Sequence, residues 1–551
     1  MTVKKLTLPA VLLLLVLCSL AWVRSNDLYF EIRQQLAIFS ELYREVATRY
    51  VDEIPPRELM EHGIRSMLDM LDPYTEFITE GEQQQMEILS TGTYGGVGIE
   101  AGTRGGHIVV IAPLEGYPAE RAGIRPGDYI IQVNGVTTEG MTPVEVQQLL
   151  VGDPGLEVVL EIERPGVEEA VRYELERERI EVANVTYSAR LGSEKSTGYI
   201  QIGHFGQNVS EELRQILVSF LEEGELTGLI LDLRNNPGGL LHEAVRITDK
   251  FVDPGILIVE TRGRVDEERQ TYTTEETALL GELPLVILIN RGSASASEVV
   301  AGALQDLDRA VILGETSFGK GLVQTIRPLP YNRSMKLTVS RYYIPSGRGI
   351  QSATYNHNGQ ATDRVEVIAD SLRREFRTKN GRVVFDGMGI EPDIVIRGQD
   401  DSLLEMHLKQ KNHYFFFIND LLSTLSSDQL SAEPPENLFD LFKEYLETQE
   451  FEYETSADRQ LVSLEEAQHL FADTSRAQGA LQELGELLRN QKENELHDNR
   501  HRIEQELHLE WVSRLSGSKE GMKASLPSDR YIQQALSLLS SRAVYDSILN
   551  P

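Results

Sequence analysis

Residues 285–307 read LVILINRGSASASEVVAGALQDL, and this stretch contains the pattern of a strand, a tight turn and a helix. Five consecutive apolar residues, Leu285 to Ile289, are typical of a strand that is buried on both faces of a sheet. Small residues follow, and a helix is expected from Ala296 to Leu307. A turn of this kind can present a hydroxyl group at the point where the free N–H groups of the helix converge.

Strands and helices alternate on both sides of this stretch, between residues 167 and 396. The expected strands are 198–202, 228–233, 285–289 and 310–313, and the expected helices are 209–223, 240–251 and 296–307. Such alternation predicts an α/β sheet domain.

Length and charge limit what the rest of the molecule can be. With 551 residues the chain is long for one hydrophobic core, so three or four domains are expected. Its 86 acidic and 53 basic residues give a net charge of −33, which repels phosphate backbones and argues against nucleic acid as a partner. Cys18 is the single cysteine, so an intramolecular disulfide and a thiolate zinc site are excluded.

The first 25 residues indicate the compartment. Lys4 and Lys5 precede an apolar stretch, 6–23, as in a secretory signal, and small residues allow cleavage after Ala21. An uncleaved membrane anchor is the alternative, because about 18 apolar residues can just span a bilayer. In both cases the rest of the chain is expected outside the cytoplasm, in the periplasm or tethered to the inner membrane.

The segment that follows the signal is expected to form a helical module at 26–92. Apolar residues recur at three- and four-residue steps between Leu28 and Tyr50, which predicts one face of an amphipathic helix. Core packing or dimerisation accounts for this stripe.

Two more segments flank the α/β domain. Short apolar runs and an Asn134-Gly135 turn signal predict a compact β-rich unit at 93–166. Residues 399–551 are expected to be a helical extension, with a loop at 516–527.

The serine run at 293–297 is the first candidate for chemistry. A hydroxyl group at the predicted helix entrance would face N–H donors that suit the oxyanion of an acyl transfer. The alternative needs no catalysis, because Ser295 and Glu298 also have the spacing of a capping box. The run by itself leaves both interpretations open.

The second candidate is Lys320, which lies between Gly319 and Gly321 and is followed by apolar residues. An ordinary lysine has a pKa of about 10.4, and burial can lower it by as much as about 3–5 units. A buried lysine beside a serine then supplies a neutral amine as general base, and Gln324 can orient that amine. A solvated lysine over a glycine turn is the alternative.

A third segment, 232–239, follows another apolar strand and contains Gly238 and Gly239. Because glycine has no side chain, either residue can bring its backbone N–H close to the same oxyanion. An ordinary turn accounts for the segment equally well.

Two segments resemble a nucleotide-binding and a zinc-binding motif, but each lacks one residue that the motif requires. Residues 314–320 imitate a phosphate-binding loop, but Gly321 stands where Ser or Thr would bind magnesium. His242-Glu243 begins like a zinc-protease helix, but Arg246 stands at the place of the second histidine. We therefore expect no metal and no nucleotide cofactor.

Taken together, these motifs resemble the C-terminal processing (tail-specific) serine peptidases, in the family's order and over residues 30–396. The GGVGI stretch at 95–99 and the segment 118–128 resemble a bacterial PDZ domain. The resemblance implies a multi-domain α/β protein, with a PDZ domain at 93–166, a serine peptidase core at 167–398 and helices before and after them.

The resemblance also implies roles for individual residues, because the family uses a serine/lysine dyad without metal or nucleotide. The nucleophile carries over to Ser295, the general base to Lys320 and the lysine-positioning residue to Gln324. The oxyanion hole carries over to the backbone N–H of Ala296 and that of Gly238 or Gly239. Ser293 and Ser297 are then packing or capping residues.

The PDZ resemblance implies how substrates are chosen. A peptide C-terminus adds to the domain as a strand, while N–H groups of the loop formed by Gly96, Val97, Gly98 and Ile99 hold its carboxylate. The expected partners are unfolded or flexible C-terminal tails of envelope proteins. The N-terminal and C-terminal helices are expected to offer contacts to an adaptor or to a second copy of the chain.

Two other functions compete with this interpretation. The first is a non-catalytic PDZ scaffold or adaptor of the cell envelope, against which the intact Ser295, Lys320 and Gln324 argue. The second is an acyltransferase or crotonase-like enzyme, whose coenzyme-binding determinants are not apparent in the sequence.

Overall fold

The structure is a computed structural model of the chain. It describes residues 8–80, 82, 92–167, 169–355, 365–367, 370–396, 402–425, 431, 433–471 and 473–550, with the backbone alone at 8–27, 353–355, 365–367, 370 and 493. The chain divides into two compact units, which are described separately. The first contains residues up to 79 together with 324–338 and 355–365, and the second contains the other residues.

The predicted signal or anchor at 1–25 lies outside the residues whose side chains are described, and it stays a prediction. Among the described residues, no helix has the length and apolar character needed to span a membrane.

The first unit contains α1 (Leu8–Arg49), α2 (Pro56–Leu68) and β1 (Glu76–Ile78). Pro56 lies in the first turn of α2, where a missing N–H leaves no hydrogen bond unmade. β1 pairs antiparallel with β18 (Arg333–Tyr343), which also pairs with β17 (Leu322–Leu329).

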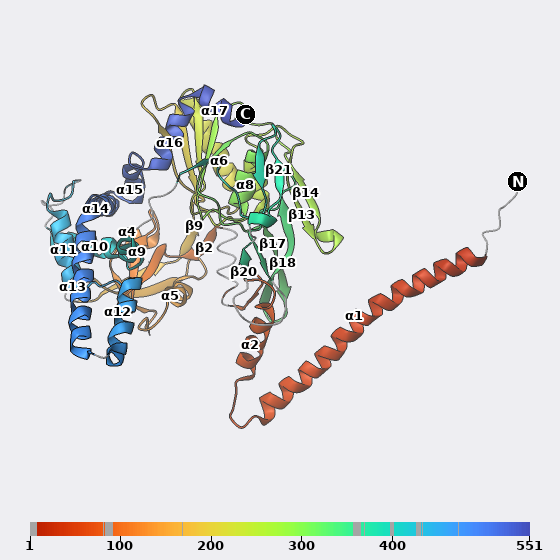
Figure 1. Cartoon of the computed structure of the whole chain (residues 1–551), viewed down its shortest axis with the longest axis horizontal. Coiled ribbons are helices and arrows are strands. Elements are labelled where there is room, and N and C mark those ends of the chain that lie inside the picture. The colour runs from red at the N-terminus through yellow and green to blue at the C-terminus, as the bar shows by residue number, and fades with distance from the viewer. Residues whose placement is uncertain are drawn as a thin grey trace. The chain divides into compact units, whose positions relative to one another are not determined.

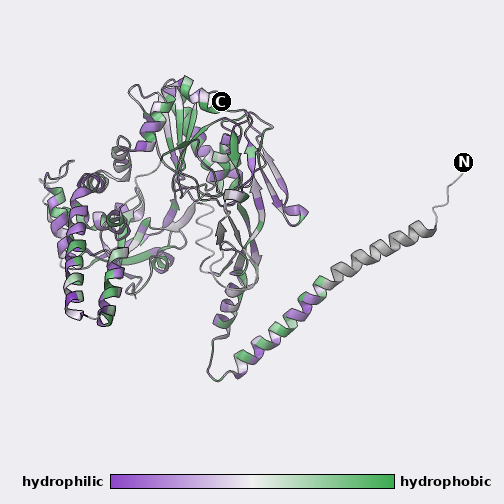
Figure 2. Cartoon of the chain, viewed as in Figure 1, coloured by the Kyte–Doolittle hydropathy of each residue, from purple (hydrophilic) through white to green (hydrophobic). Residues whose placement is uncertain are grey.

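Residues 28–49 of α1 alternate between hydrophobic and hydrophilic side chains along the helix (Figure 2). Large apolar side chains are exposed on it, among them those of Leu28, Ile32, Leu36 and Phe39. The predicted amphipathic helix is therefore present within this unit.

A six-stranded sheet forms the centre of the second unit, in the order β10-β11-β12-β15-β16-β23. β10 is antiparallel to its neighbour and the other strands run parallel. The bounds are Val185–Leu191, Thr197–Ile202, Gly228–Asp232, Leu285–Ile289, Val311–Gly314 and Ile394–Val395. Every residue of β12, β15 and β16 is buried, so the predicted α/β class is confirmed.

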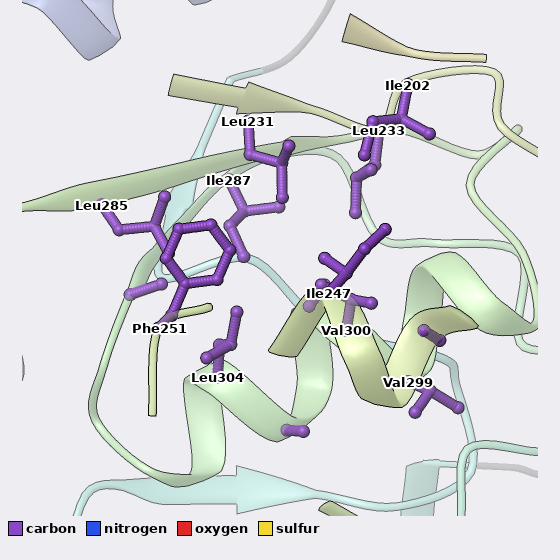
Figure 3. Close-up of a cluster of buried hydrophobic side chains, with 14 of the residues drawn as sticks. Ile202, Leu231, Leu233, Ile247, Phe251, Leu285, Ile287, Val299, Val300 and Leu304 are labelled. Carbon is purple, nitrogen blue, oxygen red and sulfur yellow. The ribbon is translucent and has the colours of Figure 1, made fainter. Parts of the chain in front are cut away.

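Helices cover both faces of this sheet. One face packs against α6 (Val209–Glu223), α7 (Leu241–Thr248) and α8 (Ala296–Asp306), and Figure 3 shows residues of this cluster. The other face packs against α16 (Arg530–Leu539) and α17 (Arg542–Leu549) near the end of the chain (Figure 1). Successive residues of each strand point to opposite faces, so both helical layers are needed to bury them.

Further strands of the second unit surround this core. β13 (Leu257–Gly263) pairs with β14 (Gln270–Thr273) and with β18. Two short pairs follow in the chain, with bounds Ala353–Tyr355, Val365–Val367, Glu375–Arg377 and Val383–Phe385 for β19 to β22.

The predicted β-rich unit has its own core and two short helices, α4 (Pro118–Arg121) and α5 (Pro143–Leu150). Its main sheet has the order β3-β4-β5-β7-β8, with β6 on β5, so β3 is an edge strand. The bounds of β2 to β9 are Thr93–Gly96, Ile99–Arg104, His107–Pro113, Tyr129–Val133, Val136–Thr137, Glu157–Glu163, Val171–Glu176 and Glu178–Glu181.

The C-terminal region is helical, as predicted, and most of its helices share one apolar core. The bounds of α9 to α14 are Leu403–Gln410, His413–Thr424, Leu438–Thr448, Ser456–Glu466, Thr474–Asp498 and Arg500–Ser516. Helix α10 contacts the β-rich unit, where Phe415 and Phe416 pack on Val109 and Asp420 pairs with Arg104 at 2.9 Å.

The loop predicted at 516–527 is wrong over most of its length, because α15 occupies Ser518–Ser525. The serines at both ends suggest a loop, but Glu520, Met522 and Lys523 between them are good helix formers. Packing of Met522 on the core that contains α16 stabilises this short helix.

Candidate active site

Three loops leave the same edge of the parallel sheet, at the carboxyl ends of β12, β15 and β16. These loops contain the glycine turn at 235–239, the serine run at 293–297 and the lysine loop at 315–321. In open α/β sheets this edge is where ligands bind.

Ser295 lies at the entrance of α8 in a strained backbone conformation. Its φ is +54° and its ψ is −112°, and the residue is 8% exposed. A non-glycine residue with positive φ is uncommon, and such strain is concentrated at functional sites. A sharp, strained strand-to-helix turn is also where α/β-hydrolases present a serine hydroxyl.

The two neighbouring serines are bound to the chain at and just before the glycine turn. Ser293 Oγ donates to the carbonyl of Leu233 at 2.7 Å, and Ser297 Oγ donates to the carbonyl of Asn236 at 2.9 Å. Both side chains are fully buried. These bonds agree with the packing roles expected for Ser293 and Ser297.

The glycine turn lies directly against Ser295. A Cβ atom on Gly238 would be 2.9 Å from both Ala296 N and Ser295 Cβ, so a side chain does not fit there. Gly238 N–H donates to Asn236 Oδ1 at 2.9 Å. Among the described residues no hydrogen bond takes up the N–H of Gly239 or of Ala296.

Glu298 connects the serine run to the lysine loop. Its Oε2 accepts hydrogen bonds from the backbone N–H groups of Ser295 and Lys320, each at 2.8 Å. Its Oε1 accepts from Gly319 N–H at 2.7 Å and from the Ser317 hydroxyl at 2.5 Å. One carboxylate therefore holds the backbones of Ser295 and Lys320 on the same side of the sheet.

The carboxylate of Glu298 is fully buried, and burial raises its pKa to about 7. The four accepted hydrogen bonds act in the opposite direction, because each stabilises the ionised form. The contact between Ser295 and Glu298 is thus more than a helix cap, because the same carboxylate also binds the lysine loop.

A residue that the sequence reasoning missed also contacts Ser295. The side chain of Tyr342, on β18, is buried beside that of Ser295: burial raises the pKa of this tyrosine to about 12, and the neighbouring serine acts in the opposite direction. Its backbone N–H donates to the carbonyl of Gly321 at 2.9 Å. Ser340, Tyr342 and Ile344 are all buried, so alternate residues of β18 face inward, but no local pattern in the sequence indicates that Tyr342 meets Ser295.

Lys320 is half-buried in the lysine loop. Gln324 lies on β17 in the first unit, where its side-chain amide donates to Thr338 Oγ1 at 3.3 Å. Its predicted role toward Lys320 stays a prediction.

The predicted carboxylate-binding residues run from the last residue of β2, Gly96, through Val97 and Gly98 to the first residue of β3, Ile99. Val97 and Ile99 point into the core of the β-rich unit, and Gly98 has a φ of +74°. The carbonyls of Val97 and Gly98 accept hydrogen bonds from Ala119 and Leu114, which fixes the loop. The loop lies at one end of the edge strand β3.

Three segments of the chain match known families. Residues 196–358 match peptidase family S41, and residues 109–164 match the PDZ domain. Residues 404–539 match the family described as "Probable PDZ-protease, C-terminal helical domain".

Two proteins with related sequences carry the same description. The carboxy-terminal-processing protease of Bartonella bacilliformis is 38% identical over 321 residues, which are 58% of this chain and 73% of that protein. The carboxy-terminal processing protease CtpB of Bacillus subtilis is 29% identical over 406 residues, which are 71% of this chain and 82% of that protein. A solved structure, the photosystem II D1 C-terminal processing protease, is 28% identical, covers 65% of this chain and 92% of its own, and has a TM-score of 0.36.

Proposed function

The chain belongs to peptidase family S41 and is a serine peptidase of the carboxy-terminal processing kind, and we propose that it uses Ser295 as nucleophile and Lys320 as general base. The observation that carries this proposal is the carboxylate of Glu298, which accepts hydrogen bonds from the backbones of both residues.

In the proposed reaction the neutral amine of Lys320 takes the proton of the Ser295 hydroxyl as the oxygen attacks the substrate carbonyl. Backbone N–H groups stabilise the oxyanion that forms. The N–H groups of Ala296 and Gly239 are available for this role, and Gly238, whose N–H binds Asn236, lies next to them. The protonated amine then gives its proton to the leaving nitrogen, and water hydrolyses the acyl-enzyme by the same sequence in reverse. Gln324 orients the lysine amine in this proposal.

The PDZ domain is consistent with binding of peptide tails. We expect a C-terminal tail to extend the sheet along the edge strand β3, with its carboxylate at the N–H groups of residues 96–99. Local N–H dipoles are needed for this task because the whole chain carries a net charge of −33.

The predicted signal at 1–25 supports export to the bacterial envelope as the place of action. The exposed apolar side chains of α1, such as Leu28 and Leu36, support a contact with an adaptor or a second copy.

Tail selection is tested with two unstructured substrates that differ only in an apolar or a charged C-terminal tail. We expect the full chain to cleave both, with kcat/KM about tenfold higher for the apolar tail. Gly98→Ala should abolish this preference, because a Cβ there would lie 2.6 Å from Tyr117 Cβ on a backbone with φ of +74°.

Gly105→Ala is the matched control, because Gly105 also has positive φ in this domain but has open space around it. It should keep the preference. Equal cleavage of the two substrates by the wild-type chain would reject PDZ selection, and no cleavage of either would favour the scaffold function.

Glu298→Gln is expected to lower kcat about 100-fold, because misplacement of reacting groups by about 1 Å has an effect of this size. In either orientation the glutamine NH2 faces at least one backbone N–H that now has no acceptor, so the serine run and the lysine loop separate. Ser317→Ala removes a single donor to Glu298 and should change kcat by less than about threefold. A wild-type kcat for Glu298→Gln in steady-state peptide hydrolysis would contradict this role.

A further inference from the structure

The start of α16 reaches two of the three loops of the candidate active site. Asp529, the N-cap of α16, places its Oδ2 2.8 Å from Arg234 Nη2. Arg234 directly precedes the glycine turn at 235–239, and its guanidinium also binds Asp232 at the end of β12. The contact thus joins residues that are 295 positions apart in the chain.

Tyr531, two residues further on, reaches the lysine loop. Its hydroxyl donates to Glu315 Oε1 at 2.8 Å, and Glu315 is the first residue of that loop. The ring of Tyr531 lies under the guanidinium of Arg234, 4.8 Å from its centroid, which adds a cation–π contact. Asp529 and Tyr531 therefore connect the glycine turn to the lysine loop.

The arrangement is shielded from solvent and anchored on the sheet. Asp232 is fully buried and also accepts a hydrogen bond from Tyr199 at 2.8 Å, and the Arg234 side chain is 16% exposed. Ile532 and Ala535 of α16 belong to the apolar core on the adjacent sheet face. Separating Arg234 from its carboxylate partners would leave a shielded charge without compensation, which is energetically costly. The ion pairs therefore keep the segments that carry these residues in place.

The glycine turn needs an external constraint of this kind. Asn235, Gly238 and Gly239 all have positive φ, at 58°, 100° and 147°, so the turn has an unusual conformation. Its donors contribute to catalysis only if they already point at the oxyanion before the reaction.

We propose that Asp529 and Tyr531 are positioning residues of the peptidase site. From the start of α16 they hold the glycine turn and the lysine loop in fixed positions relative to each other. This inference rests on the proposed roles of Ser295, Lys320 and the glycine turn. It gives the end of the helical extension a part in catalysis although neither residue touches the substrate.

Asp529→Asn tests the proposal without removing the helix cap. The Oδ1 of Asp529 caps α16 by accepting from Tyr531 and Ile532 N–H, and asparagine is an equally good cap, but it lacks the charge that binds Arg234. Tyr531→Phe keeps the ring under Arg234 and removes the hydroxyl, with its bond to Glu315 at 2.8 Å and a longer one to the carbonyl of Ile396 at 3.5 Å. We expect kcat to fall about tenfold in each variant with KM within about twofold, and Asp529→Glu to recover part of the loss.

Asp546→Asn on α17 is the matched control, because it removes the same charge from an exposed pair with Arg542. It should keep the wild-type kcat. All variants are compared at a temperature at which circular dichroism shows them folded, by peptide hydrolysis and by the rate at which a serine-reactive fluorophosphonate labels Ser295.

The outcomes separate this inference from the proposed function. A slower labelling rate together with a lower kcat supports positioning. A wild-type kcat and labelling rate in both Asp529→Asn and Tyr531→Phe, or a change confined to KM, overturns it. Absence of labelling at Ser295 in the wild-type chain would instead reject the nucleophile on which the inference rests.

Discussion

Replacement of Ser295 by alanine is expected to lower kcat by a factor on the order of 10⁴ to 10⁶. The acyl-enzyme needs an oxygen nucleophile, and an alanine at this position leaves only the N–H donors and substrate binding to accelerate attack by water. The fold should persist, because the cap bond at this residue is made by its backbone N–H to Glu298.

Ser293→Ala and Ser297→Ala provide the comparison within the same run. The first removes a bond to the carbonyl of Leu233 and the second a bond to that of Asn236 in the glycine turn, so we expect losses of less than about tenfold in kcat. Mass spectrometry after fluorophosphonate treatment should find the adduct on Ser295 in the wild-type chain and none in Ser295→Ala. An adduct on Ser293 or Ser297, or full activity of Ser295→Ala, would show that another residue is the nucleophile.

Replacement of Lys320 is expected to lower kcat by a factor of about 10³ to 10⁴, near the upper end of what a general base contributes. Lys320→Met keeps an unbranched side chain, one heavy atom shorter, without the amine. Lys320→Arg keeps the positive charge, but a guanidinium stays protonated and cannot accept the serine proton. Both variants should therefore show this loss, although only one of them loses the charge.

The pH profile distinguishes a base from a structural cation. In the wild-type chain kcat/KM should rise with pH, because only the unprotonated amine accepts the proton of Ser295. The residual activity of Lys320→Met should lack this acid limb. Substantial activity of Lys320→Arg, or an unchanged acid limb in Lys320→Met, would argue that Lys320 is not the base.

The sequence was most informative where one physical cause dominates. Strands buried on both faces must be continuously apolar, so β12 and β15 were predicted nearly to their ends. The family was recognisable because its motifs occur in order along the chain. The roles of Ser295 and Lys320 stay predictions, supported by the shared contacts of Glu298.

Features that depend on tertiary contacts were not predictable in the same way. β2 and β3 form within the glycine-rich stretch 92–106 because β9 and β4 supply their hydrogen-bond partners. No local pattern indicates that Asp529 meets Arg234, because the contact exists only when α16 packs on the sheet. Tyr342 escaped notice for the same reason, since only the fold brings it to Ser295.

The burial of the parallel sheet by the last helices has a consequence for how the protein is made. The strands β11, β12, β15 and β16 precede α16 and α17 in the chain, so the sheet face that contacts these two helices has no apolar cover until they have been synthesised. A growing chain therefore lacks both the apolar cover and Asp529 while its serine and lysine are already present. The contact between Asp529 and Arg234 can thus form only after α16 has been added to the chain and has packed on the sheet.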